Sequence, residues 1–386
     1  MKYILFLIFL VSHLKSATIV RGPYLDYLSS NSATIRYSVD SPEITWFSWG
    51  EFPKCNKYLT VTTPKKNQYV NIYGLKIAKK YCYMIYLPVS NSTHSYLASS
   101  ATFTTFYDET VSSFSFIVIG NTFLNSPDQN IALSSAIFSF PDINFIIHTG
   151  NISNGNLLDH DTYYFMPFSG ILKSIPFFIS LGLKEYGEIK EKTNSYRFLG
   201  ENFSPYYRFA RNGFSPHYYF IDSGTSRFIF LDNNNLNEID SAPSLRKGTK
   251  QYQWLEETLK YSNSKKWRFV VLNHPIYPSS IGGEDIKEGL EELFLKYKVD
   301  FVFQSGNKYY LRTKPLKYGV PDEGGVIYIT VGGGDLYLSE IEASEIIETQ
   351  IDSRVFLNIK IDERKIDISA FDCSMNLLDR FVYSKY

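Results

Sequence analysis

From Phe114 onward, the sequence repeats one unit: a short apolar run that is followed directly by a polar loop. These runs occupy residues 114–119, 143–148, 175–181, 228–231, 267–272, 300–304 and 326–331. Such short and continuously apolar runs are typical of strands that are buried on both faces of a sheet. Apolar residues with helical spacing at 130–138 and 252–261 predict helices that cover these strands. The pattern therefore predicts an α/β layered domain with its functional site at the carboxyl ends of the strands.

The segment before this domain follows a β pattern without helices. Short alternating runs lie at 33–39, 45–49, 68–73 and 81–87, and turn residues separate them. This spacing predicts a small β-sandwich. Alternating β patterns return near the end of the chain, at 356–361, 365–371 and 378–383. We therefore expect a β-sandwich domain at 18–107 and an α/β domain with a C-terminal β tail at 112–386.

The first residues have the pattern of an export signal. Met1-Lys2 is a short basic start, residues 3–11 are apolar, and Ser16-Ala17 offers small residues for cleavage. The apolar run is too short to span a bilayer, and no later run is long enough. We expect residues 1–17 to be a signal peptide and the mature protein to be secreted or exported, with no membrane span. The alternative is an ordinary N-terminal strand.

Charge and cysteine content limit the partners and the redox chemistry of the chain. Lys+Arg and Asp+Glu each number 39 in 386 residues, so no basic excess indicates a nucleic-acid partner, and the partner stays unknown. Cys55 and Cys82 fall in the same β-rich segment, which allows one disulfide between them. Cys373 is left over, and we expect a buried apolar side chain there rather than a nucleophile. Glycosylation sequons, which matter only where the source glycosylates its proteins, begin at Asn91, Asn151 and Asn202.

Five strand ends of the α/β domain carry the polar residues from which a site would form. They read Gly120-Asn121, Gly150-Asn151-Ile152-Ser153-Asn154, Gly182-Leu183-Lys184-Glu185, Asn273-His274-Pro275 and Gly306-Asn307-Lys308-Tyr309. Carboxyl ends of parallel strands meet at one edge of a sheet, so these side chains are expected to line one cleft.

The sequence around these strand ends resembles the purple acid phosphatases, within the calcineurin-like metallophosphoesterases. The similar stretches are 21–25, 159–162, 165–170, 175–178, 251–256, 312–313 and 328–334. The resemblance covers nearly the whole mature chain. It implies a fibronectin-like β-sandwich followed by a four-layer α/β/β/α metallophosphoesterase domain. It also implies the family's di-metal centre, of Fe with Zn or Mn.

This sequence departs from the family at every metal-ligand position. The family's strand ends carry Gly-Asp, Gly-Asp-x-x-Tyr, Gly-Asn-His-Asp/Glu, Val-x-x-His and Gly-His-x-His, whose side chains hold two metal ions. The corresponding residues here are Asn121, Asn151, Asn154, Leu183, Lys184, Asn273, Asn307 and Tyr309, the last with one residue deleted before Arg312. A neutral amide offers one carbonyl oxygen and cannot bridge two cations as a carboxylate does. We therefore expect no metal cofactor and no catalytic residue, with Lys184 and His274 as degenerate remains of the catalytic positions.

The resemblance and its departures together predict a catalytically inactive homologue, a pseudo-phosphatase with a binding or structural role. In a binding role, the amides and the positive charge of Lys184 would hold an anionic small molecule or a glycan in the old cleft. Drift is an equally open origin, because codons for Asp, His and Tyr each become Asn by one first-base change. The alternative function is a metal-dependent phosphomonoester hydrolase with an altered site, built from His274, His148 and Asp161.

Residues near the old cleft are expected to have structural roles. His148 ends a strand and is expected to be a hydrogen-bonded flanking histidine. Asp159, His160 and Asp161 lie at a helix start, where caps and solvated charges are usual. Glu185 and His274 are expected to be structural as well.

Overall fold

The computed structural model describes residues 16–89, 92–153, 157–186, 207, 209–237, 242–278, 284–305, 309–332 and 345–385. Expectations about most of the export signal, at residues 1–15, lie outside the described residues, as do those about Asn91, Asn154, Asn202 and Asn307. Among the described residues, no helix is long and apolar enough to cross a membrane.

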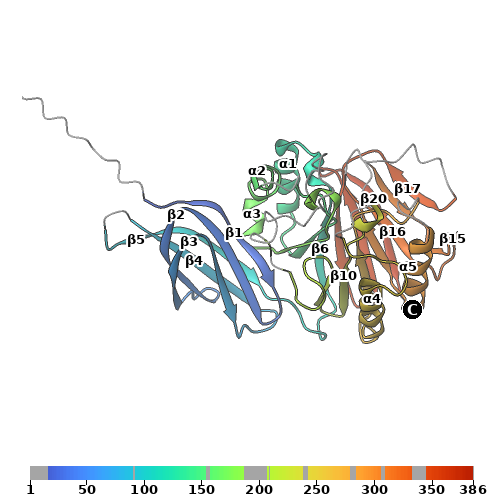
Figure 1. Ribbon diagram of the computed structural model, residues 1–386, viewed down its shortest axis with the longest axis horizontal. Helices are drawn as coiled ribbons and strands as arrows, with labels where there is room; N and C mark the ends of the chain where they lie inside the picture. The colour runs from blue at the N-terminus through green and yellow to red at the C-terminus, as the bar shows by residue number, and fades with distance from the viewer. Residues whose placement is uncertain are drawn as a thin grey trace, which may run out of the picture.

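The N-terminal part is a five-stranded sheet, which Figure 1 shows beside the rest of the molecule. Its strands are β1 (Ile19–Leu28), β2 (Ser32–Glu51), β3 (Lys57–Tyr73), β4 (Lys80–Pro88) and β5 (Ser95–Thr104). The order is β1-β2-β4-β5, and β3 pairs with the other edge of β2. The sequence predicted two strands at 33–39 and 45–49, but the structure has one long strand, β2, that pairs first with β1 and then with β4. Register shifts between Ser38 and Thr45 let this strand change partners without ending.

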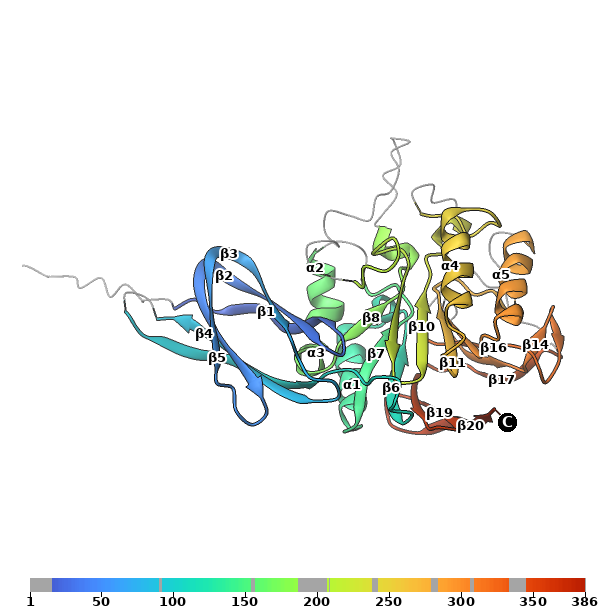
Figure 2. The same ribbon diagram turned by 90° about the horizontal axis from the view of Figure 1, so that it is seen from below.

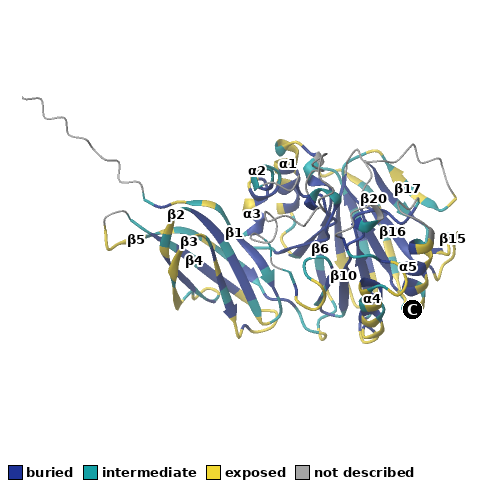
Figure 3. Ribbon diagram, in the orientation of Figure 1, coloured by how far each residue is buried: buried dark blue, intermediate teal, exposed yellow. Residues whose placement is uncertain are grey.

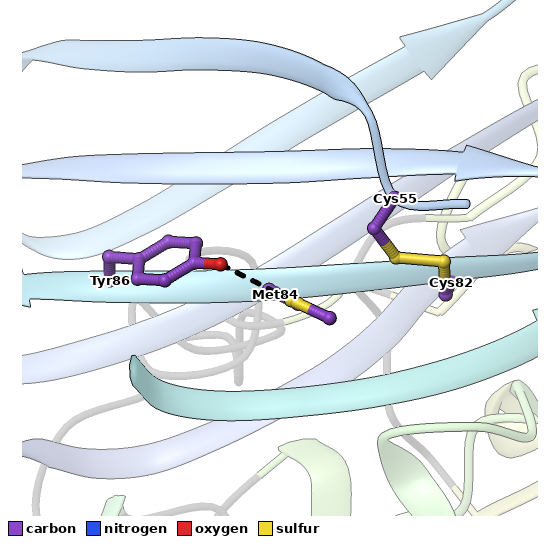
Figure 4. The surroundings of a disulfide bond; sticks show 4 residues. All are labelled: Cys55, Cys82, Met84 and Tyr86. Atoms are coloured by element: carbon purple, nitrogen blue, oxygen red, sulfur yellow. Dashed lines mark hydrogen bonds between the residues drawn. A yellow bond between two sulfur atoms is a disulfide. The ribbon is translucent and has the colours of Figure 1, made fainter. Parts of the chain in front are cut away.

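Apolar side chains on both halves of β2 enter the core of the predicted β-sandwich. Ile35 and Phe47 are both fully buried in one cluster with residues of the other strands. A disulfide joins Cys55, in the turn before β3, to Cys82 on β4, as the cysteine spacing allowed (Figure 4). Cys373 is half-buried rather than buried, because it lies in an exposed turn between the last strands.

Two stacked sheets form the second part of the molecule. The first has the order β20-β19-β18-β6-β7-β8 and the second the order β17-β13-β16-β12-β11-β10-β9. The first sheet contains β6 (Phe114–Ile119), β7 (Ile143–His148), β8 (Phe177–Ile179), β18 (Phe356–Ile361), β19 (Lys365–Phe371) and β20 (Leu377–Ser384). The second contains β9 (Tyr219–Ser223), β10 (Ser226–Phe230), β11 (Trp267–Val271), β12 (Phe301–Gln304), β13 (Tyr310–Thr313), β16 (Ile327–Thr330) and β17 (Ile347–Ile351). A short pair, β14 (Leu316–Lys317) and β15 (Val320–Pro321), stands apart.

Successive side chains along a strand point to opposite faces of its sheet, so each sheet packs against the other sheet on one face and against helices on the other. On β6, Phe116 points into the core between the sheets, where its ring centroid lies 5.0 Å from that of Phe228 on β10. Its neighbour Ile117 packs instead with the helices on the outer face. Those helices are α1 (Pro127–Phe138), α2 (Leu157–His160) and α3 (Ser169–Leu172), whereas α4 (Lys250–Lys260) and α5 (Glu284–Lys296) cover the second sheet. Figures 2 and 3 show α4 and α5 outside the stacked, buried strands, so the predicted α/β/β/α architecture is confirmed.

An ion pair attaches the N-terminal sheet to the second part. Arg21 on β1 donates from Nε and from one terminal nitrogen to the two carboxylate oxygens of Asp161, and its guanidinium carbon lies 5.2 Å from the ring centroid of Phe165. Asp161 begins a π-helical turn, η2 (Asp161–Phe165), directly after α2. The expectation of solvated charges at this helix start was therefore wrong for Asp161. His160, beside it, is fully buried.

Candidate functional site

Three of the expected site residues meet where the carboxyl ends of the two sheets come together. Asn121 follows β6 and Asn151 follows β7, two parallel neighbours in the first sheet. Asn273 follows β11 of the second sheet. All three side chains are buried, with at most 2% of their surface exposed.

Unusual backbone conformations place these side chains. Asn121 (φ 52°) and Asn151 (φ 60°) adopt the left-handed conformation, which asparagine tolerates better than most residues. Gly182 lies so close to Asn151 that a Cβ atom there would be 2.4 Å from its Oδ1. Gly150 is equally restricted, since a Cβ there would be 2.8 Å from Asn273 Nδ2. These strand-end glycines are therefore needed for the close approach of the three loops.

The three carboxamides form one hydrogen-bond network. Asn151 Nδ2 donates to Asn121 Oδ1 at 2.8 Å and, more weakly, to Asn273 Oδ1 at 3.5 Å. Asn151 Oδ1 accepts from the backbone N–H of Lys184 at 3.0 Å. Asn273 Nδ2 donates to the backbone oxygen of Thr149 at 2.7 Å. The network therefore links β6, β7, β11 and the short 3-10 helix η3 (Leu183–Tyr186).

Backbone hydrogen-bond partners determine the positions of the side-chain oxygen and nitrogen in Asn151 and Asn273. A backbone N–H only donates, so the Asn151 atom that faces Lys184 is the oxygen, and the nitrogen faces the other two asparagines. A backbone carbonyl only accepts, so the Asn273 atom that faces Thr149 is the nitrogen, and its oxygen faces Asn151. The NH₂ group of Asn151 therefore donates toward two amide oxygens that could otherwise bind a cation.

These residues do not fit the di-metal centre that the resemblance implies. A bound cation requires oxygen lone pairs or neutral imidazoles directed at it, but a hydrogen-bond donor occupies the middle of this cluster. Among the residues that the structure describes, no group of three or more His, Cys, Asp or Glu side chains could hold a metal ion. The sequon at Asn151 is equally unsuited to glycosylation in the folded chain, because its side-chain nitrogen is buried and hydrogen-bonded.

Lys184 contributes to the cluster through its backbone rather than its charge. Its ammonium nitrogen lies 5.3 Å from the ring centroid of Phe123, a cation–π contact, whereas the sequence suggested a charge in the middle of the cleft. Leu183 is half-buried and packs against the outer core. Tyr309 is buried just before β13.

Glu185 holds the loops around the cluster in place. Its fully buried carboxylate accepts from the backbone N–H groups of Asn151 (2.9 Å), Ile152 (2.7 Å) and Gly182 (2.6 Å). Burial raises the pKa of this carboxyl, and the backbone hydrogen bonds oppose that rise. Glu185 therefore has a structural role, because its side chain organises the strand-end loops.

The three histidines around the cleft are buried and engaged. His148 lies 2.9 Å from Thr122 Oγ1 through Nε2 and accepts from the backbone N–H of Gly150 through Nδ1, as expected for a flanking histidine. His274 Nε2 lies 2.9 Å from Asn234 Oδ1. Burial lowers the pKa of His148 and of His160 to about 3 and that of His274 to about 4. With Asp161 paired to Arg21, the residues named for an altered metal site have separate partners.

Sequence reasoning missed one polar cluster beside the asparagines. Asp232, which is fully buried, accepts hydrogen bonds from Tyr186 and from the side chain of Asn234 at 2.7 Å. His217 Nδ1 lies 2.7 Å from the same carboxylate. The signal was present in the sequence, since Asp232 follows the apolar run at 228–231 as the other site residues follow theirs.

Comparisons with known proteins show what this chain is similar to. Residues 116–305 match the family model of the calcineurin-like phosphoesterases. The chain is 33% identical over 105 residues to a phosphoenolpyruvate phosphatase of Allium cepa, covering 23% of this chain and 22% of that protein. It is 36% identical over 90 residues to purple acid phosphatase 21 of Arabidopsis thaliana, covering 22% of this chain and 21% of that protein. The alignments thus span about a fifth of the length of these curated relatives.

The fold likeness extends over far more of the chain. The purple acid phosphatase PPD1 from yellow lupin (Lupinus luteus) seeds superposes with a TM-score of 0.74 over 95% of this chain and 74% of that one, at 16% sequence identity. The likeness covers both the N-terminal sheet and the layered part.

Proposed function

We propose that this chain, a purple acid phosphatase-like member of the calcineurin-like metallophosphoesterases, is a catalytically inactive homologue whose old cleft has a structural role. The observation that carries the proposal is the donor position of Asn151. Its NH₂ group points at the oxygens of Asn121 and Asn273, where the family's chemistry requires metal ligands.

The same network favours a structural role over retained binding in the cleft. An anion or a glycan would need free donors, but the donors of Asn151 and Asn273 are already engaged with protein oxygens. Breaking these bonds to admit a ligand would leave buried polar atoms unpaired, which costs about 1–3 kcal/mol for each. The ammonium of Lys184 lies over the ring of Phe123 and not among the three carboxamides.

The proposal also covers processing and domain organisation. We propose that residues 1–17 are a signal peptide with cleavage near Ser16-Ala17, which would place the mature N-terminus just before β1. On this proposal the protein is secreted, with a β-sandwich domain at 18–107 and a phosphoesterase domain at 112–386. Mass spectrometry of the protein purified from its source would give the N-terminus directly.

Metal content and hydrolysis test the central claim. Purified mature protein should contain well under one equivalent of Fe, Zn or Mn, and phosphomonoester hydrolysis should stay at background across acid and neutral pH, even with these metals added. A chelator should leave the melting temperature unchanged, since no ligand set links metal affinity to folding. A purple acid phosphatase with intact ligands serves as the matched control in the same assays.

The contrary result is equally clear. Stoichiometric metal with turnover above background would overturn the inactive assignment and favour the hydrolase with an altered site.

A further inference from the structure

One end of the N-terminal sheet carries a strong local excess of positive charge. We call residues 49–58 and 76–82, where β2 turns into β3 and β4 begins, the basic tip. Its charged residues are one acid, Glu51, and five lysines: Lys54, Lys57, Lys76, Lys79 and Lys80. The net charge of the tip is therefore +4, although the whole chain has 39 basic and 39 acidic residues.

Covalent and hydrogen bonds make the two segments one compact surface. The Cys55–Cys82 disulfide ties the turn to β4 (Figure 4). The backbone N–H of Phe52 donates to the backbone oxygen of Lys80 at 3.0 Å. Glu51 lies 2.6 Å from the ammonium of Lys76, so the tip's single acid is already paired within the tip.

Large apolar side chains project from the same surface. Phe52 is 50% exposed, Tyr58 79% and Ile77 46%. The ammonium of Lys80 lies 4.9 Å from the ring centroid of Phe52, which places charge and apolar surface in contact. Exposed apolar side chains gathered at one place on a soluble surface are typical of an interaction site.

Three other acids near these strands have partners outside the tip. After β5, Asp108 accepts hydrogen bonds from Thr110, and Glu109 pairs with Lys265 of the second part at 2.7 Å. Glu43 lies toward the other end of β2, opposite Lys65. The residues of the tip itself keep their net charge of +4, which would attract a negatively charged partner.

We propose that the basic tip docks on a membrane surface that bears anionic lipid headgroups. Lysines near such a surface are attracted by its negative potential, and exposed aromatic and aliphatic side chains gain by entering the boundary between headgroups and acyl chains. An acidic polymer would satisfy the lysines but leave Phe52 and Ile77 in water. The combination of charge and apolar exposure therefore favours the lipid surface, and this inference does not depend on the state of the old cleft.

Co-sedimentation of the mature chain with vesicles tests the inference. The protein should bind phosphatidylcholine vesicles that contain phosphatidylserine, bind pure phosphatidylcholine much less, and lose binding at high salt. The Lys54→Gln/Lys80→Gln double variant should bind about 25-fold more weakly, from about fivefold for each lysine. Phe52→Ala/Ile77→Ala should bind at least about fivefold more weakly through lost apolar burial.

Matched controls keep the result specific. Lys65→Gln/Lys66→Gln removes the same charge from exposed positions of β3 away from the tip, and Phe138→Ala removes a 71% exposed apolar side chain from α1. Both should bind as the unchanged protein does, and unaltered melting curves would show that all variants are folded.

Three results would overturn the proposal. One is the absence of binding by the unchanged protein to the anionic vesicles. Another is equal loss of binding in the tip and control variants. The third is binding to heparin or polyglutamate without binding to vesicles, which would identify an acidic polymer as the partner.

Discussion

Replacing Asn151 with aspartate would test directly whether an amide donor holds the strand ends together. The change is nearly isosteric, so it alters hydrogen bonding and charge without altering packing. The oxygen that replaces Nδ2 would face Asn121 Oδ1 at the 2.8 Å donor distance and Asn273 Oδ1 at 3.5 Å. Two attractive contacts would become contacts between acceptors.

The structure sets the size of the effect. Losing one good hydrogen bond costs about 1 kcal/mol, and leaving the buried Asn121 oxygen without a donor costs about 1–3 kcal/mol more. With Asn151 only 2% exposed, solvent cannot replace the lost donor. We therefore expect Asn151→Asp to lower the free energy of unfolding by about 3 kcal/mol at neutral pH, with no gain of hydrolysis.

The effect should depend on pH with a definite sign. Burial among acceptors should raise the pKa of the new carboxyl in the folded state above its unfolded value of about 4. The protonated carboxyl can donate again. The loss of unfolding free energy caused by Asn151→Asp should therefore be largest above the pKa of the carboxyl in the folded state, and it should shrink as the pH falls toward the pKa in the unfolded state.

Denaturant unfolding of the two proteins at several pH values measures this loss. Asn31→Asp is the matched control, because Asn31 is exposed and its Oδ1 accepts from Ser29, a role that a carboxylate retains. An Asn151→Asp protein as stable as the parent at neutral pH would refute the donor assignment. Recovery of hydrolysis by this single change would refute the correspondence with the family's ligands.

Two further predictions concern the surroundings of the cluster. Burial lowers the pKa of His148 and of His160 to about 3, so the folded state excludes protons that the unfolded chain binds below its histidine pKa of about 6.5. Stability should therefore fall by up to about 1.4 kcal/mol per pH unit for each histidine as the pH drops from 6.5, and a flat profile in urea unfolding between pH 7 and 5 would contradict this. Gly182→Ala should destabilise by about 2 kcal/mol, because its Cβ would lie 2.4 Å from Asn151 Oδ1. Gly170→Ala, with no atom within 4 Å of the new Cβ, should be close to neutral, and equal melting temperatures for the two variants would count against the tight contact.

The layered part of the fold could be predicted because its strands carry unambiguous local signals. The runs at 143–148, 356–361 and 365–371 coincide with β7, β18 and β19. Helix α5 was not among the predicted helices, although its apolar residues pack on the second sheet. The full length of β2 could not be predicted from the sequence either, because the turn-forming residues Asp40, Ser41 and Pro42 lie inside it. Pairing with the neighbouring strands keeps the chain extended despite these residues.

The site could be predicted in position but not in its bonding. Strand-end spacing and the family resemblance indicated that Asn121, Asn151 and Asn273 would be neighbours, and the structure brings them into hydrogen-bond contact. What Lys184 does could not be read from its type, because its backbone N–H, rather than its ammonium, meets Asn151. The direction of the Lys184 side chain depends on its contact with the aromatic ring of Phe123, which comes from another loop.

The amide network also bears on how a metal site can disappear without loss of the fold. Removing two cations from a cluster of carboxylates would leave like charges in contact, which destabilises the folded state. The amide of Asn151 is uncharged and supplies a donor between the oxygens of Asn121 and Asn273, so it provides an attraction that would otherwise require a cation. Such a replacement is favoured by folding alone, whether or not the cleft acquires a ligand. Selection for a biological role would then be expected to act elsewhere on the surface, and the charge of the basic tip is the feature that folding alone does not require.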